Sequence, residues 1–126
     1  MDDIRNRIEI TVDESRTAEA MGSGELPVFA TPAMIALIEE TCWRSVADTL
    51  EDGCGTVGTR LDISHVSATP AGIKVWCESE LVQRDGRRLQ FNVEVFDESG
   101  LIGKGTHERF IVDNEKFMEK ASGKLK

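Results

Sequence analysis

Apolar and polar residues alternate along five stretches of the chain, which is the period of a strand with one buried face. The stretches cover residues 8–12, 57–65, 73–81, 89–95 and 102–112. Polar turns at Ser67–Gly72, Arg84–Gly86 and Asp97–Gly100 separate the last four stretches. We therefore expect these four to form strands in hairpin succession, with the odd-numbered residues 57–65 on one face of the first.

The period changes to 3.6 between the first two strands. Thr31 is a good N-cap, and Pro32 suits the first helical position because its φ is already set and it has no N–H to satisfy. The pattern predicts one helix from Pro32 to about Leu50, ending near Gly53 and apolar over half its circumference. Glu39 breaks this pattern, since its position falls inside the apolar arc.

Two segments lack a clear period. Residues 13–30 form a long connection rich in Gly, Ser, Glu and Pro. Loops of this kind serve either as lids or as mobile surface loops without a role. Residues 113–126 carry four lysines, and we expect them to form a short helix or a flexible tail.

The order of these elements predicts an α+β protein, in which an antiparallel sheet of about five strands wraps around one long central helix. A chain of 126 residues is the usual size of one domain and too short for two ordinary ones. We therefore assign residues 1–126 to a single domain. Such a sheet leaves a strand edge exposed, and the pairing of edges in a homodimer is one way to cover it.

The composition limits which binding partners and which cellular compartment are expected. The formal net charge of −8 opposes nucleic-acid binding, and no apolar run is long enough to span a membrane. The charged N-terminal residues lack the apolar core of a signal peptide. Cys42, Cys54 and Cys77 are odd in number and match no metal-ligand spacing. We expect reduced thiols in a cytoplasmic protein, and no metal site.

Three polar residues stand where the pattern expects apolar ones or where an element ends, namely Thr31, Glu39 and His65. Each has a structural explanation: an N-cap for Thr31, an ion pair with an arginine across an interface for Glu39, and a hydrogen-bonded core position for His65. Together they bring a hydroxyl, a carboxylate and an imidazole to one seam between helix and sheet. Nucleophilic and acid–base catalysis use these groups, so the three form a candidate catalytic set.

The run Val28–Glu39, VFATPAMIALIE, is similar to the helix start of hotdog-fold thioesterases of the fluoroacetyl-CoA-thioesterase-like family. Gly58 and His65 match that family in identity and spacing, and so does Arg109 within the sequence GTHERF. The resemblance covers roughly residues 8–112. It implies a hotdog fold and an acyl-CoA thioesterase that hydrolyses a small acyl-CoA thioester. CoA would be part of the substrate, and no cofactor is implied.

The resemblance also implies roles for single residues. Thr31, Glu39 and His65 would form the catalytic set, with His65 as general base or acid. Glu39 would orient His65, activate water or attack directly, and Thr31 would accept the acyl group or position water. Gly58, which has no Cβ, would let the backbone contact the oxyanion. Arg109 would pair with Glu39 or contact the substrate.

One straight helix cannot bring Thr31 and Glu39 into contact. Eight residues at 1.5 Å each separate them by about 12 Å along the axis. A shared site therefore needs a substrate that lies along the helix, a bridging His65, or a residue from a second protomer. We expect the site at or near a homodimer interface.

The long connection departs from the family pattern. The fluoroacetyl-specific enzyme is associated with a phenylalanine-bearing lid, whereas residues 13–30 hold one aromatic residue, Phe29, beside Met21 and Leu26. We therefore expect a short or medium acyl group other than fluoroacetyl.

Binding of CoA requires local positive charge on this acidic chain, and it should weaken as salt rises. The candidates are Arg60, Lys74, Arg84, Arg87, Arg88 and Lys104. Two other functions fit the same fold. An acyl-CoA dehydratase would need a dedicated Asp–His motif, which the chain lacks. A non-catalytic acyl-CoA-binding or sensor domain would keep Thr31 and Glu39 in structural roles.

Overall fold

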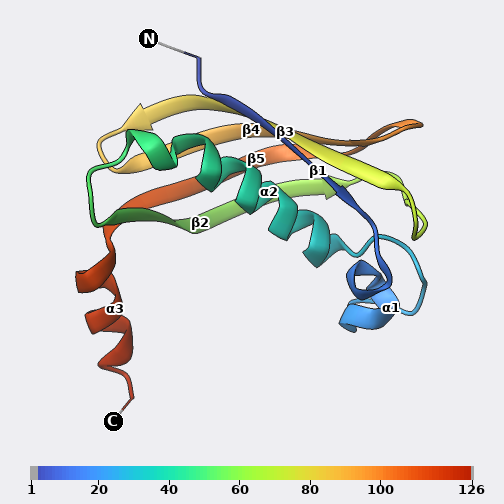
Figure 1. The fold of residues 1–126 in the computed structure, drawn as a ribbon, viewed down its shortest axis with the longest axis horizontal. Coiled ribbons are helices and arrows are strands. Elements are labelled where there is room, and N and C mark those ends of the chain that lie inside the picture. The colour runs from blue at the N-terminus through green and yellow to red at the C-terminus, as the bar shows by residue number, and fades with distance from the viewer. Residues whose placement is uncertain (1–2, 126) are drawn as a thin grey trace.

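Five antiparallel strands form one curved sheet in the computed structural model, which describes residues 3–125 (Figure 1). The strands are β1 (Arg5–Thr11), β2 (Cys54–His65), β3 (Lys74–Asp85), β4 (Arg88–Asp97) and β5 (Gly100–Asp113). Their order across the sheet is β1-β3-β4-β5-β2. The predicted domain, 1–126, includes residues 1, 2 and 126, which lie outside the described residues.

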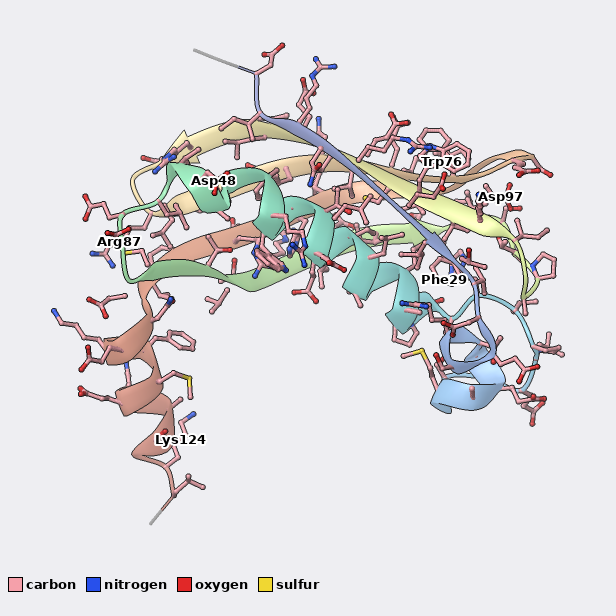
Figure 2. All side chains as sticks on the ribbon, in the orientation of Figure 1. Phe29, Asp48, Trp76, Arg87, Asp97 and Lys124 are labelled. Carbon is pink, nitrogen blue, oxygen red and sulfur yellow. The ribbon has the colours of Figure 1, made fainter. Side chains whose placement is uncertain are left out.

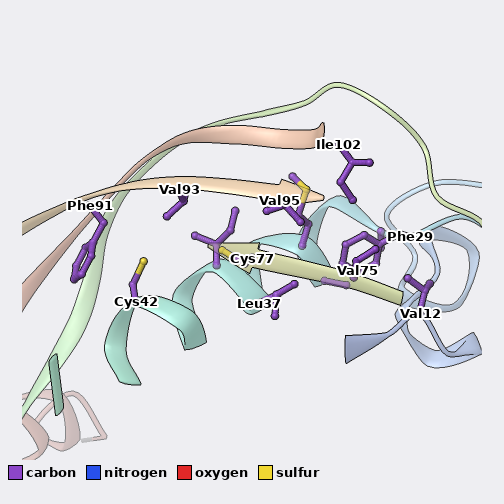
Figure 3. Close-up of a cluster of buried hydrophobic side chains, with 14 of the residues drawn as sticks. Val12, Phe29, Leu37, Cys42, Val75, Cys77, Phe91, Val93, Val95 and Ile102 are labelled. Atoms are coloured by element: carbon purple, nitrogen blue, oxygen red, sulfur yellow. The ribbon is translucent and has the colours of Figure 1, made fainter. Parts of the chain in front are cut away.

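The long helix α2 (Thr31–Val46) packs against the sheet, which curves around it (Figure 1). Its buried apolar residues are Ala33, Met34, Leu37, Ile38, Cys42 and Val46. The sheet contributes Val75, Cys77, Leu89, Phe91, Val93, Val95 and Ile102 to the same core (Figure 3). Burying one such side chain stabilises the fold by about 1.5–3 kcal/mol, so this seam holds the helix in place. The predicted sheet around one central helix is confirmed.

The predicted start of the helix is wrong by one residue. The N-cap is Ala30, whose carbonyl accepts from the Met34 N–H at 3.0 Å, and Thr31 is the first helical residue. Phe29 and Ala30 are buried, and the Phe29 N–H donates to the Thr69 carbonyl at 2.7 Å. Because these buried residues fix where the chain turns into the helix, the Thr31 hydroxyl is not used as a cap.

The helix also ends earlier than the pattern predicts. α2 stops at Val46, and a single 3-10 turn, η2 (Ala47–Thr49), follows it. The Thr49 hydroxyl donates to the Val46 carbonyl at 2.7 Å, which satisfies an acceptor that the α-helix leaves free. Local capping therefore ends the helix before Gly53.

β2 and β3 do not form the predicted hairpin. β2 pairs with β5, and β3 pairs with β1 and β4, so two strands lie between β2 and β3. Contacts with distant residues hold the connection between them. The Thr69 hydroxyl donates to Asp97 at 2.7 Å in the interior, and Pro70 bridges to Val28. Because of this crossing, β1 and β2 are the two edges of the sheet.

A bulge divides β2 into two halves. The pairing with β5 shifts between Gly58 and Arg60, which leaves Thr59 as an extra residue. Gly58 faces Glu39 of α2, whereas the Thr59 hydroxyl bonds to the Glu108 carboxylate at 2.9 Å. The prediction that all odd-numbered residues 57–65 share one face is therefore wrong before the bulge. It holds for His65, which contacts the start of α2.

The two segments without a period contain short helices. Residues 13–30 hold η1 (Glu14–Arg16) and α1 (Ala18–Met21), and a bridge between Thr17 and Phe29 closes the segment, so it is not structureless. The tail forms α3 (Asn114–Ser122), which projects away from the sheet (Figure 1). Within residues 3–125, no helix has the length and apolar character needed to cross a membrane.

Candidate active site

Thr31 and His65 form a hydrogen-bonded pair at one end of the central helix. Thr31 opens α2 and His65 closes β2, and Thr31 Oγ1 lies 2.8 Å from His65 Nδ1. The edge of the imidazole approaches the ring of buried Phe29, with centroids 6.4 Å apart. A hydroxyl and an imidazole at this distance can exchange a proton.

The surroundings of His65 favour its neutral form. Burial lowers its pKa below the ordinary 6.5, and the nearby backbone of Ser67 opposes that shift. Its Nε2 atom is buried and has no hydrogen-bond partner among residues 3–125. His65 is therefore a neutral base near pH 7, with one ring nitrogen left for a further partner.

Glu39 and Arg109 form a second cluster, near the middle of α2. The Arg109 Nη1 group donates to Glu39 Oε2 at 3.3 Å. The guanidinium is buried, whereas the Glu39 side chain is 38% exposed. Thr56 anchors the guanidinium, since Nε donates to its hydroxyl at 2.8 Å and Nη2 to its carbonyl at 3.0 Å. Glu39 thus pairs with Arg109 of its own chain, whereas its structural explanation expected an arginine across an interface.

Gly58 lies directly under the Glu39 carboxylate. A Cβ at Gly58 would approach Glu39 Oε2 to 2.7 Å and Arg109 Nη1 to 3.3 Å. Real Cβ atoms are not found this close to another heavy atom, so only glycine leaves room for the carboxylate in this position.

His107 belongs to the same cluster, and the sequence analysis missed it. It is fully buried on β5, with Nε2 lying 3.1 Å from Arg109 Nη1 and Nδ1 lying 2.8 Å from the Arg60 carbonyl oxygen. The sequence carries a usable signal, because His107 and Arg109 are two residues apart on one strand and so share a face. Two adjacent polar positions on an inward face predict a buried polar cluster.

The predicted site residues therefore fall into two groups. One is the Thr31–His65 pair, and the other is Glu39 with Gly58 and Arg109. Both groups lie between α2 and β2. Thr31 and Glu39 are eight positions apart on the helix, which separates the groups by about 12 Å along its axis. A single chain thus presents two candidate half-sites along one seam, beside the free edge of β2.

Two hollows open on the surface of the molecule. One, of about 390 Å³, reaches Arg109 and is walled by Trp43, Leu50 and Cys54. The other, of about 1170 Å³, lies on the outer face of the sheet among charged residues such as Arg7, Glu78 and Lys104. The larger hollow is on the opposite side of the sheet from both half-sites, so it carries none of the candidate chemistry.

The cysteines are thiols in the structure. Cys42, Cys54 and Cys77 are all free, and burial raises the pKa of Cys77 to about 12, which keeps it neutral. Among residues 3–125, no three side chains of His, Cys, Asp or Glu gather as metal ligands.

The basic residues proposed for CoA fall into two groups. Arg84, Arg87 and Arg88 surround the β3–β4 turn, at the end of the molecule where Asp48 follows α2 (Figure 2). Arg84 lies 3.5 Å from the Thr49 hydroxyl, and Arg88 pairs with Glu108 at 3.2 Å. The others occupy outward strand positions: Arg60, Lys74 and Lys104.

Comparison with known proteins finds similarity along most of the chain. Residues 12–115 match the model of a family described as fluoroacetyl-CoA-specific thioesterase. A fluoroacetyl-CoA thioesterase of Streptantibioticus cattleyicolor is 43% identical over 97 residues, which cover 77% of this chain and 70% of the relative.

Solved structures agree with this match. A structure of the fluoroacetyl-CoA thioesterase FlK superimposes with a TM-score of 0.90 at 37% identity, covering 95% of this chain and 93% of the other. A thioesterase superfamily member from Thermus thermophilus gives 0.85 at 27% identity, covering 96% and 89%. A hot-dog-like protein from Thermanaerovibrio acidaminovorans, at 17% identity and 0.87, covers 97% and 90% and shares the fold.

Proposed function

The chain belongs to the family of fluoroacetyl-CoA-specific thioesterases, and from this premise we propose that it hydrolyses a small acyl-CoA thioester through Thr31, His65 and Glu39. Membership makes it an acyl-CoA thioesterase, and the expected hotdog fold and family are confirmed. The products are the free acid and CoA, so CoA enters as part of the substrate.

The contact between Thr31 and His65 carries the proposed mechanism. With Oγ1 2.8 Å from Nδ1, the neutral imidazole can take the hydroxyl proton while Oγ attacks the thioester carbonyl carbon. The carbon–sulfur bond then breaks and CoA leaves as the thiolate. The proton taken from Thr31 stays on His65. The acyl group remains on Thr31 as an ester.

Glu39 completes the reaction in this proposal. Its half-exposed carboxylate removes a proton from water, and the resulting hydroxide attacks the carbonyl carbon of the Thr31 ester. The bond between that carbon and Thr31 Oγ1 then breaks, His65 returns its proton to Oγ1, and the acid is released. The backbone at Gly58 lies beside this carboxylate without a Cβ, which suits it to contact the oxyanion. Arg109 keeps a positive charge next to Glu39 and the developing negative charge.

In this proposal the two half-sites meet when a second protomer binds. We place the homodimer interface at the β2 edge, because Thr31, His65 and Glu39 all lie along that side of α2. Antiparallel pairing of two β2 strands about a two-fold axis brings the end of one strand near the start of the other. The Thr31–His65 pair of one protomer then approaches Glu39 of the second, and pairing also covers the free edge.

The acyl group is proposed to be short or medium in length and different from fluoroacetyl. Phe29, the one aromatic residue of segment 13–30, is 1% exposed and packs beside His65, so it does not lie over the site as a mobile lid. The exposed apolar residues of the segment are Met21 and Leu26.

The remaining proposals concern the whole chain. We infer one domain over residues 1–126, a cytoplasmic location suited to three free thiols, and no membrane or nucleic-acid partner for a chain of net charge −8.

A substrate panel with matched variants tests this function. Release of free thiol is measured for acetyl-, fluoroacetyl-, butyryl- and hexanoyl-CoA. We expect Thr31→Ala, His65→Ala and Glu39→Gln each to lower kcat by about 10²- to 10³-fold, and Thr31→Ser to retain activity. Glu40→Gln is the control, since Glu40 is the neighbouring carboxylate but pairs with Arg44 on the helix surface.

Mass spectrometry of the Glu39→Gln variant tests the order of steps. An acyl group should accumulate on Thr31, because attack succeeds while water is no longer activated. Acyl-CoA binding without turnover in the wild type would instead support the non-catalytic sensor function. Activity unchanged in all three catalytic variants would reject the residue assignment.

A further inference from the structure

His107 is a buried polar residue to which the proposed reaction gives no direct part. It lies on β5, opposite Leu61 of β2, and is 1% exposed. Its ring stacks on Phe91, with centroids 6.3 Å apart. A buried imidazole is costly unless its nitrogens have partners, and both nitrogens of His107 have one.

The partners determine the protonation state of His107. A guanidinium only donates hydrogen bonds, so Nε2, which lies 3.1 Å from Arg109 Nη1, must be the acceptor. The ring is then neutral and carries its proton on Nδ1, which donates to the Arg60 carbonyl at 2.8 Å. Burial also lowers the pKa of His107. Arg60 directly follows the bulge, so the imidazole joins the bulge to Arg109.

Different residues accept hydrogen bonds from the different nitrogens of the Arg109 guanidinium. Thr56 accepts from Nε and from Nη2, and within residues 3–125 His107 and Glu39 alone accept from Nη1. The bond to Glu39, at 3.3 Å, is the longest of the four. Strand residues therefore set the position of the guanidinium, and His107 sets the position of the nitrogen that faces Glu39.

We propose that His107 is a positioning residue for Glu39, acting through Arg109. As a neutral acceptor on Nη1, it keeps one N–H of that nitrogen on itself and directs the other to Glu39 Oε2. Among residues 3–125, Glu39 Oε1 makes no hydrogen bond, which leaves this oxygen for water or substrate. The proposal rests on the catalytic role of Glu39 in the proposed function.

In this arrangement Arg109 holds the Glu39 carboxylate in a fixed position, although the Glu39 side chain is half-exposed. Without His107, Nη1 loses one acceptor and the guanidinium can turn about its remaining bonds to Thr56. Glu39 then loses its fixed partner, although it stays on the same helix. Because Thr31 and His65 lie at the other end of the seam, substrate binding and attack are affected less than the step that uses Glu39.

Kinetics of three variants test this role. His107→Leu removes the acceptor, and we expect kcat to fall by at least about tenfold with KM changed less than twofold. His107→Gln keeps an amide oxygen that can accept from Arg109, and we expect it to recover most of kcat. Phe91→Leu is the matched control, since it removes the ring that stacks on His107 but none of the polar contacts, and its kcat should stay near the wild-type value.

Denaturant unfolding of each variant separates activity from folding. Equal loss of kcat in His107→Leu and Phe91→Leu, or no recovery in His107→Gln, would overturn the positioning role. A wild type that turns over no acyl-CoA would overturn the proposed function and with it the catalytic part of this inference.

A second measurement does not depend on turnover. Two-bond ¹H–¹⁵N spectra of the full chain at pH 7 should show His107 as the neutral tautomer with its proton on Nδ1. A proton on Nε2, or on both nitrogens, would overturn the proposal even in an active enzyme.

Discussion

At the residue scale, a substitution at Gly58 is expected to lower activity while leaving stability nearly unchanged. A Cβ added there lies 2.7 Å from Glu39 Oε2, the far end of a flexible, half-exposed side chain. We predict that Gly58→Ala changes the free energy of unfolding by no more than about 1 kcal/mol. We also predict that it lowers kcat by at least about tenfold, because the carboxylate must move. Denaturant unfolding and a thiol-release assay measure the two effects.

Gly55→Ala supplies the matched control on the same strand. Its Cβ would lie equally close, 2.7 Å, to the Asn114 Oδ1 atom, which also ends a side chain and lies outside the Glu39 cluster. Activity should survive this change. Equal loss of activity in both variants would mean that any added methyl group on β2 impairs turnover, and that the displacement of Glu39 is not the cause.

At the element scale, the exposed edge of β2 matters most, because the proposed dimer pairs through it. Leu61 is 41% exposed near the middle of this 12-residue strand. We predict that Leu61→Arg converts the proposed homodimer into monomers, because it places a charge in the proposed interface along the β2 edge, and that activity falls with it. Size-exclusion chromatography with light scattering measures the change from twice 13.9 kDa to 13.9 kDa.

The opposite edge of the sheet provides the control for this prediction. Thr11→Arg places the same charge at an exposed position on β1 and should leave the mass and the activity unchanged. A wild-type mass of 13.9 kDa would contradict the dimer and the composite site.

At the scale of the whole molecule, the two histidines tie stability to pH. Burial lowers the pKa of both His65 and His107 in the folded state below the ordinary 6.5. Below pH 6.5 the unfolded chain therefore binds more protons than the folded one, so the free energy of unfolding falls as the pH drops. Above pH 6.5 this contribution is fully present.

Urea unfolding at pH 7.5, 6.5 and 5.5 checks this sign. The fall in stability should be shallower in His107→Gln and in His65→Gln, since an amide does not titrate. A wild-type stability that does not change between pH 7.5 and 5.5, or that rises, would contradict it.

The sequence by itself determined the features that depend on neighbouring residues. Alternation located five strands, the 3.6 period located the central helix, and Glu39 stood out because it interrupts an apolar arc. The residues around Thr31–Pro32 and at Gly58, His65 and Arg109 also carried the family resemblance. These signals are local, since each depends on side-chain chemistry and spacing along a single element.

Only the tertiary structure decided what depends on contacts between distant residues. The order of β2 and β3 follows from pairing with β5 and β1, and the face of Gly58 follows from a bulge that exists only relative to β5. The release of Thr31 from capping depends on the buried position of Ala30. His107 belongs to the cluster because the pairing of strands brings Arg60 and Arg109 next to it, and Arg109 reaches Glu39. Such contacts are set by the packing of the whole chain, and no local period encodes them.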